Sequence, residues 1–125
     1  MIIVDTDVLI WILRGDRIVG ETFKKVVAET KGYIFITPIQ IAEIYKGLRT
    51  KEKLKVETFL ETLNVIDINK NIGKIAGEFL NKYESSHNVT IADAIIGASA
   101  KINAFKLWTL NKKHYPMFMD KEFIG

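Results

Sequence analysis

Short apolar runs alternate with longer amphipathic stretches along this chain. Runs rich in β-branched and aromatic residues occupy positions 2–5, 33–36, 64–68 and 106–110, and polar residues follow each of them. Runs of this length and composition predict buried strands. The intervening segments are long enough for helices, and strands joined through helices pair in parallel, with helices on both faces of the sheet. The pattern therefore predicts an α/β fold of the doubly wound class.

Three of the helices are predicted from their first residues. Thr37 and Gln40 flank a proline at the first helical position, which predicts a helix from about 38 to 48. Thr90 and Asp93 form a similar capping pair before another apolar stretch. Asn69 can cap a long helix running to about residue 85. One face of that long helix carries Ile72, Ile75, Ala76, Phe79, Leu80 and Tyr83.

Composition places the chain among ordinary globular domains. Its 125 residues, 48% hydrophobic and 26% charged, predict a single domain over residues 1–125. The sequence contains no cysteine, which excludes disulfide scaffolds, thiolate zinc sites, iron–sulfur clusters and cysteine nucleophiles. Neither a signal peptide nor an apolar run of about 18 residues is recognisable, so we expect a cytoplasmic protein without a membrane segment.

The charge balance is mildly basic. The net charge is +3 and the pI is near 9.1, and 15 of the 18 basic residues are lysine. This balance permits a polyanionic partner through long-range attraction, but surface lysine also serves solubility. Charge alone therefore leaves the function open.

Polar residues with metal-binding chemistry follow the predicted strands. Asp5 ends the first strand, Glu43 lies two turns into the helix after the second, Asp93 begins the helix before the last, and Thr109 and Asn111 end the last. Ligands of parallel sheets bind at the carboxyl ends of the strands, so we expect these residues to converge. Clustered carboxylates repel one another by ~1 kcal/mol per pair in water and ~4 kcal/mol at an effective dielectric of 20, which favours a bound cation.

The available ligand atoms select the type of cation. The candidate ligand atoms are oxygens, and the chain has no cysteine and only two histidines. Such a ligand set favours a hard ion such as Mg²⁺ or Mn²⁺ over zinc. Mg²⁺ usually takes one or two carboxylates and leaves room for a phosphate of the substrate. One or two such ions lower the pKa of a water molecule and neutralise charge on a phosphodiester, so the cluster predicts metal-assisted hydrolysis.

Each of these acids also has a structural interpretation. Asp5 can cap a helix that begins near Thr6, and Asp93 can be the acidic member of a capping box. Glu43 lies away from the predicted apolar face of its helix and can be a solvated side chain. That apolar face is predicted to consist of Ile41, Ile44, Tyr45 and Leu48.

Four further residues are assigned structural roles. Asp7 is predicted to belong to the first turn of the first helix, and Asp67 to be an acid at a strand end. Trp11 and Trp108 lie in apolar sequence surroundings, so both are predicted to be core residues rather than platforms for base stacking.

Four segments together resemble the PIN-domain family, specifically its small single-domain branch of VapC-type toxins. They are residues 3–10, 37–47, 91–96 and 107–115, and they span essentially the whole chain. The resemblance implies a three-layer α/β/α fold around a central, mainly parallel twisted sheet of four to five strands. It also implies a Mg²⁺-dependent endoribonuclease that is the toxin of a toxin–antitoxin pair, with an RNA substrate, a cognate antitoxin partner and a homodimeric assembly.

The resemblance assigns roles residue by residue. Asp5, Glu43 and Asp93 match the family's acidic positions, with Asp5 and Asp93 as Mg²⁺ ligands and Glu43 positioning or deprotonating the attacking water. The fourth acidic position is Asn111 here, whose amide carries no charge; we interpret it as a residue that forms hydrogen bonds or positions water, and whether one metal ion or two are held stays open at this point. The supporting residues are Thr6 and Thr109. Contacts to RNA phosphates are assigned to Lys46, Arg49, Lys112 and Lys113.

Two alternatives from other classes remain at this point. The amide at Asn111 is compatible with a catalytically silent PIN-like binding module. A phosphoacceptor signalling domain shares a parallel sheet with acids at the strand ends, and Asp67 would then be the phosphorylated residue. Cleavage of DNA by a flap-type nuclease is a variant of the main hypothesis, although this short chain has little room for the additional elements of such enzymes.

Overall fold

The computed structural model describes residues 1–124; Gly125, the last residue of the predicted domain, lies outside the described residues. Four parallel strands form one sheet, in the order β3-β2-β1-β4. The strands are β1 (Ile2–Val4), β2 (Ile34–Ile36), β3 (Asn64–Val65) and β4 (Lys106–Trp108). The prediction of an α/β fold around a parallel sheet is confirmed.

The strands are shorter than predicted. The predicted strand over 2–5 ends at Val4 because Asp5 caps the following helix, and the strand predicted over 33–36 begins at Ile34. The run over 64–68 leaves the sheet soon after the Ile66 N–H donates to the Ile36 carbonyl, since the neighbouring strand β2 ends there. The run over 106–110 likewise turns away after Trp108.

The helices occupy the segments between the strands. They are α1 (Thr6–Leu13), α2 (Arg17–Thr30), α3 (Pro38–Lys46), α4 (Lys53–Glu61), α5 (Lys70–His87) and α6 (Ile91–Asn103). The predicted caps are confirmed at the start of α3, α5 and α6, with full capping boxes at α3 and α6. Helix α3 ends at Lys46, two residues before its predicted end.

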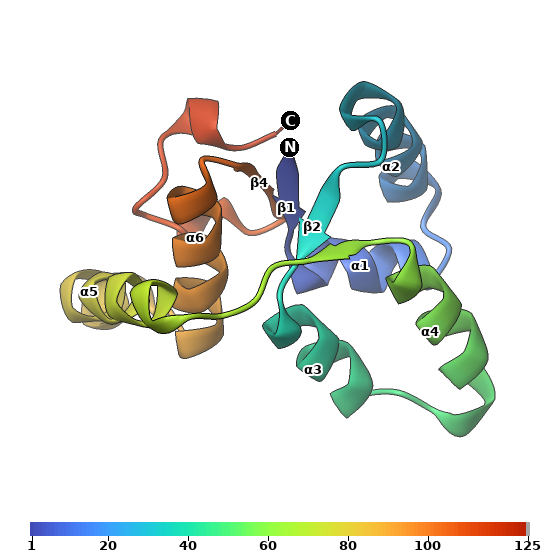
Figure 1. Ribbon diagram of the computed structural model, residues 1–125, viewed down its shortest axis with the longest axis horizontal. Coiled ribbons are helices and arrows are strands. Elements are labelled where there is room, and N and C mark those ends of the chain that lie inside the picture. The colour runs from blue at the N-terminus through green and yellow to red at the C-terminus, as the bar shows by residue number, and fades with distance from the viewer. Residues whose placement is uncertain (125) are drawn as a thin grey trace.

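Helices cover both faces of the sheet and form three layers with it (Figure 1). Side chains along β1 alternate between these two faces. Ile2 and Val4 of β1 pack with core residues of α1, α2, α3 and α4, whereas Ile3 packs with α6 and the C-terminal segment. Helix α5 packs on α6, and its predicted apolar face forms that contact. This period of two residues along β1 divides the interior into two cores that meet at the sheet.

The core contains one of the two tryptophans. Trp108 is buried, as predicted, but Trp11 is 43% exposed on α1, so its assignment to the core is wrong. Tyr45 is 40% exposed, so it too does not belong to the buried face of α3. Within residues 1–124, no helix is both long and apolar enough to cross a membrane.

The topology fixes the position of the candidate site. From β1 the chain runs outward to β2 and β3 and then returns to β4 on the other side of β1. The strand order therefore reverses between β1 and β4, which is where parallel sheets bind ligands at the carboxyl ends of their strands. The crevice at this end of β1 lies away from the N-terminus (Figure 1) and is bordered by α1, α3, α6 and the segment after β4.

Candidate active site

A cavity of about 270 Å³ opens at the reversal of strand order. All four residues predicted to be catalytic line it, although they come from four different parts of the chain. The complete lining is Asp5, Thr6, Asp7, Ile10, Glu43, Asp93, Asn111 and His114. The convergence that the sequence predicted is therefore present in the fold.

Asp5 occupies the floor of this cavity and is only 8% exposed. Its Oδ1 accepts a hydrogen bond of 2.8 Å from the Thr6 N–H, so it does cap α1. Its Oδ2 accepts from Thr109 Oγ1 at 2.8 Å and from Tyr115 Oη at 2.9 Å. The structural interpretation and the functional one are thus both compatible with this residue, and Tyr115 is a partner that the sequence analysis missed.

Asp7 belongs to the first turn of α1, as predicted, and it also lines the cavity. Its Oδ1 accepts from the Val8 N–H at 2.7 Å, as expected in a first turn. Its Oδ2 accepts from the Leu110 N–H at 3.2 Å and lies 3.5 Å from Thr109 Oγ1. Asp7 therefore joins α1 to the segment after β4 and adds a carboxylate beside Asp5.

The carboxylates at this site carry uncompensated negative charge. Burial, and then the neighbouring Asp7, raise the pKa of Asp5 from 3.8 to about 6, although the hydrogen bonds that it accepts act in the opposite direction. Burial also raises the pKa of Asp7, with a further contribution from Asp93. Among residues 1–124, no lysine or arginine lines this cavity. The site is therefore suited to a cation.

Glu43 is held by the start of α1. Thr6 Oγ1 donates a hydrogen bond of 2.6 Å to Glu43 Oε1, which leaves Oε2 for another partner. The helix that carries Glu43 is fixed to the sheet by Gln40, whose side-chain amide donates to the Val4 carbonyl at 3.0 Å. Glu43 is thus positioned relative to β1, instead of being the solvated side chain that its place off the apolar face suggested.

Asp93 has two partners in the structure. Its Oδ2 accepts from the Thr90 N–H at 3.1 Å, which completes the capping box of α6. The same oxygen lies 3.3 Å from Nδ1 of His114, a contact that the sequence analysis did not predict. The Asp93 side chain is 16% exposed and faces the cavity, so the cap also aims a carboxylate at the site.

A family model for the PIN domain matches residues 2–117 of this chain. The chain belongs to the PIN domain family. Among curated relatives, Ribonuclease VapC10 of Mycobacterium tuberculosis H37Rv is 37% identical over 119 residues, which cover 94% of this chain and 88% of that protein. Ribonuclease VapC19 of the same strain is 26% identical over 121 residues, covering 96% of each.

Solved structures agree in fold with this PIN domain. A toxin–antitoxin complex from Klebsiella pneumoniae superposes with a TM-score of 0.81 at 21% identity, covering 100% of this chain and 97% of the other. DNA-bound VapBC from Salmonella typhimurium has a TM-score of 0.78 at 18% identity, covering 91% and 89%. At these identities the likeness concerns the fold alone.

The remaining predicted residues lie around the cavity of this PIN domain. The Asn111 N–H donates to Thr109 Oγ1 at 3.1 Å, so Thr109 links Asn111 to Asp5. The predicted phosphate contacts do not line the acidic cavity. Lys46, Lys112 and Lys113 are exposed outside it, with the Lys112 ammonium 5.2 Å from the ring centre of Phe123, and Arg49 lines an adjacent cavity.

The donor set of the PIN domain fits a hard divalent ion in its chemistry. Asp5, Asp7 and Asp93 face one cavity, and burial, followed by the neighbouring Asp7, raises the pKa of Asp5. Within residues 1–124, no three histidine or carboxylate side chains are gathered closely enough to hold one ion between them. A Mg²⁺ site built here would use one or two of these carboxylates and complete its shell with water and substrate oxygens, which is the usual arrangement for Mg²⁺.

Asp67 lies elsewhere. It is exposed, follows the edge strand β3, and does not line the acidic cavity. In a phosphoacceptor domain the phosphorylated aspartate would stand among the other acids at the carboxyl ends of the strands. The position of Asp67 therefore argues against the signalling alternative.

Proposed function

We propose that this PIN domain is a metal-dependent endoribonuclease that hydrolyses RNA phosphodiester bonds and acts as the toxin of a toxin–antitoxin pair. The observation that carries the proposal is the gathering of Asp5, Glu43 and Asp93, distant in sequence, at one cavity. The proposal is supported by the 37% identity between this chain and Ribonuclease VapC10 of Mycobacterium tuberculosis. Mg²⁺ is the proposed ion, with Mn²⁺ as a substitute.

Each residue at the cavity has a role in this hydrolysis. Asp5 and Asp93 would hold the ion, which when bound supplies a Lewis acid that neutralises charge developing on the phosphodiester. Glu43 orients the attacking water and accepts its proton at Oε2, because Thr6 engages Oε1. The water oxygen bonds to phosphorus, the bond from phosphorus to the leaving oxygen breaks, and that oxygen takes a proton from solvent.

The neutral and basic residues complete the proposal. Asn111, held through Thr109, positions water beside the acids. Lys112 and Lys113 follow Asn111 directly, and Lys46 and Arg49 follow Glu43, so exposed cations border the acids on two sides. Contacts from these cations to phosphates would supply affinity that depends on salt and carries no sequence information.

Partners and location follow from the same proposal. The structural neighbours include complexes titled as toxin–antitoxin or VapBC, which supports a protein antitoxin as partner of this chain. We further propose a homodimer, and a cytoplasmic location in which the RNA substrate is present. The antitoxin would inhibit cleavage by covering the groove that contains the acids.

Cleavage of structured RNA with Mg²⁺, and again with EDTA, tests the activity. Asp93→Asn and Glu43→Gln should each lower the rate by at least about 10²-fold, the smaller end of what a positioned acid or base contributes. Glu78→Gln, an exposed position on α5, is the matched control and should retain the parent rate. Sequencing the new RNA ends then identifies the cleaved bond.

Two results would contradict the proposal. Equal rates for the parent and the two site variants would show that the acids do not carry the reaction. No cleavage by the parent, no rise in melting temperature with Mg²⁺ or Mn²⁺, and tight binding to its antitoxin would instead indicate the catalytically silent module.

A further inference from the structure

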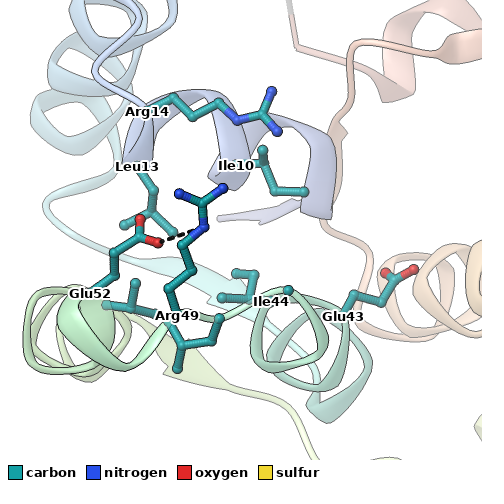
Figure 2. Close-up of a pocket in the computed structure, with 10 residues that line it drawn as sticks. Ile10, Leu13, Arg14, Glu43, Ile44, Arg49 and Glu52 are labelled. Atoms are coloured by element: carbon teal, nitrogen blue, oxygen red, sulfur yellow. Dashed lines mark ion pairs between the residues drawn. The ribbon is translucent and has the colours of Figure 1, made fainter.

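A second cavity, of about 380 Å³, lies directly beside the acidic one. The two cavities share Ile10 and Glu43, so they adjoin each other. Helices α1 and α3 and the start of α4 surround the second cavity (Figure 2). Its apolar lining consists of Ile10, Leu13, Ile44, Leu48 and Val56. The cavity therefore offers an apolar surface next to the proposed site of cleavage.

Two arginines line the cavity together with these apolar residues. Arg14 caps the C-terminus of α1, Arg49 follows α3, and both line the cavity. Arg49 reaches toward α1, whereas Arg14 extends along α1 on the side of Ile10 (Figure 2). Only three of the 18 basic residues of the chain are arginine, so two of the three converge here. Two arginines at one cavity indicate a binding site more specifically than lysines scattered over the surface do.

The guanidinium groups are available to a ligand. Within residues 1–124, Arg49 forms the only ion pair of these two arginines. Arg49 Nε lies 4.0 Å from Glu52 Oε1 in an exposed pair, and exposed pairs of this kind bind weakly. Arg14 lies over the ring of Trp11, 5.5 Å from its centre, which leaves the edge of the guanidinium free.

The chemistry of this cavity matches one nucleotide. Arginine binds phosphate through two parallel hydrogen bonds and can stack its plane on an unpaired RNA base. Bases taken out of a stack also pack between aromatic or apolar side chains. The volume of about 380 Å³ lies at the small end of the range of roughly 300–1,000 Å³ typical of small-ligand sites. The carboxylates of the acidic cavity repel phosphates, so cations beside them are needed to hold a flanking nucleotide.

We propose that Arg14 and Arg49 form a subsite for an unpaired nucleotide that flanks the scissile bond, with its phosphate between the two guanidinium groups and its base on the apolar lining. This inference rests on the proposed function. Glu43 lies in both cavities, so an RNA strand that passes from one to the other keeps the scissile phosphate at the acids. An acidic polypeptide would also satisfy the arginines, and the binding test below distinguishes it from RNA.

Binding measured without catalysis separates this inference from the activity. The probe is a fluorescein-labelled single-stranded twelve-nucleotide oligouridylate, titrated in EDTA and followed by fluorescence anisotropy. Arg14→Gln and Arg49→Gln should each weaken binding by 3-fold to 10-fold, and each should lower the slope of log affinity against log salt by about 0.7. The control is Arg17→Gln, which removes the same charge from an exposed residue outside both cavities and should change affinity less than twofold.

The outcomes are distinct. Parental affinity in both variants, no binding by the parent, or an equal loss in Arg17→Gln would overturn the subsite while leaving the cleavage assay to decide the activity. Loss of binding to a twelve-residue oligoglutamate without loss of oligouridylate binding would assign the pair to an acidic polypeptide and overturn it too. A loss confined to Arg14→Gln and Arg49→Gln supports the subsite, even if the parent cleaves no RNA.

Discussion

The phenol of Tyr115 donates a hydrogen bond of 2.9 Å to Oδ2 of Asp5, across 110 positions of sequence. Tyr115 is 1% exposed, and its ring packs edge-on against Phe118. This hydrogen bond and that from Thr109 stabilise the charged form of Asp5, opposing the effect of burial on its pKa. The segment after β4 therefore determines both the position and the ionisation of an acid that belongs to β1 and α1.

Replacing Tyr115 with phenylalanine should raise the pKa of Asp5 while the ring packing is kept. A hydrogen bond to a charged group contributes about 1.5 kcal/mol, and 1.36 kcal/mol corresponds to one pH unit. The acid limb of the pH–rate profile for RNA cleavage should therefore move to higher pH by roughly one unit in Tyr115→Phe. Tyr33→Phe, at an exposed position, should leave the profile in place. Superimposable profiles would show that Tyr115 does not influence Asp5.

The burial of the Asp5 carboxylate should lower the free energy of unfolding of the protein when that carboxylate is charged. Its pKa is about 6 in the folded protein and 3.8 as the reference value, so the folded state holds the proton more tightly. Stability from this group is therefore greatest below about pH 4 and falls as pH rises to about 6, after which the cost stays constant at about 3 kcal/mol. Asp5→Asn removes the charge, so without metal it should melt higher than the parent above pH 7.

Melting curves between pH 5 and pH 8 check this sign. The advantage of Asp5→Asn should grow from pH 5 to pH 7 and then level off, and added Mg²⁺ should raise the melting temperature of the parent more than that of the variant. Asp67→Asn, which removes an exposed carboxylate, serves as the control. An advantage that is independent of pH, or a variant less stable at pH 8, would contradict the assignment of the raised pKa to Asp5.

Local sequence signals predicted the parts of this fold that depend on neighbouring residues. The caps at Thr37, Asn69 and Thr90 were read correctly because capping bonds join residues two or three positions apart. The apolar face of α5 was likewise visible as a helical spacing. The lengths of the segments between the strands predicted that the strands pair in parallel. Parallel pairing in turn predicted that Asp5 and Asn111 lie at the same edge of the sheet.

Most features that the sequence did not predict depend on contacts between residues that are distant in the chain. Asp7 is a first-turn acid, as predicted, but nothing local indicates that the Leu110 N–H donates to it. Trp11 has apolar neighbours in sequence, but α1 turns Val8 and Leu9 inward and leaves Trp11 on its outer face. Helices α2 and α4 were not assigned, although Asp16 caps α2 and was a detectable start signal. Tyr115 and His114 were within the recognised C-terminal segment, yet their partners lie elsewhere in the chain.

The contact between Thr6 and Glu43 gives a prediction about catalysis. Thr6→Val removes the hydroxyl that donates to Glu43 Oε1 at 2.6 Å but keeps the shape of the side chain. The loss of a charge-assisted hydrogen bond of about 1.5 kcal/mol should lower kcat by about tenfold with little change in KM, because Glu43 acts on water and not on substrate binding. Thr6→Ser restores the donor and should restore kcat. A fall in kcat shared by Thr6→Ser would contradict the role of the hydroxyl.

Gln40 links the site to the sheet and should be important for stability. Its side chain is fully buried, accepts from the Thr37 N–H at 2.9 Å and donates to the Val4 carbonyl at 3.0 Å. Gln40→Met keeps the volume and leaves both backbone groups without these partners, at about 1–3 kcal/mol for each buried group. Urea unfolding should therefore show a free energy of unfolding lower by about 2–6 kcal/mol.

The control for Gln40 distinguishes its hydrogen bonds from a general effect of methionine on a helix. Asn81→Met places the same side chain on an exposed position of α5 and should change stability by less than about 0.5 kcal/mol. Equal midpoints for Gln40→Met and the parent would contradict the prediction. Because Gln40 fixes α3 to the end of β1, the Gln40→Met protein that remains folded should also hold Glu43 less firmly. Its kcat for RNA cleavage should then fall under conditions in which circular dichroism shows it to be native.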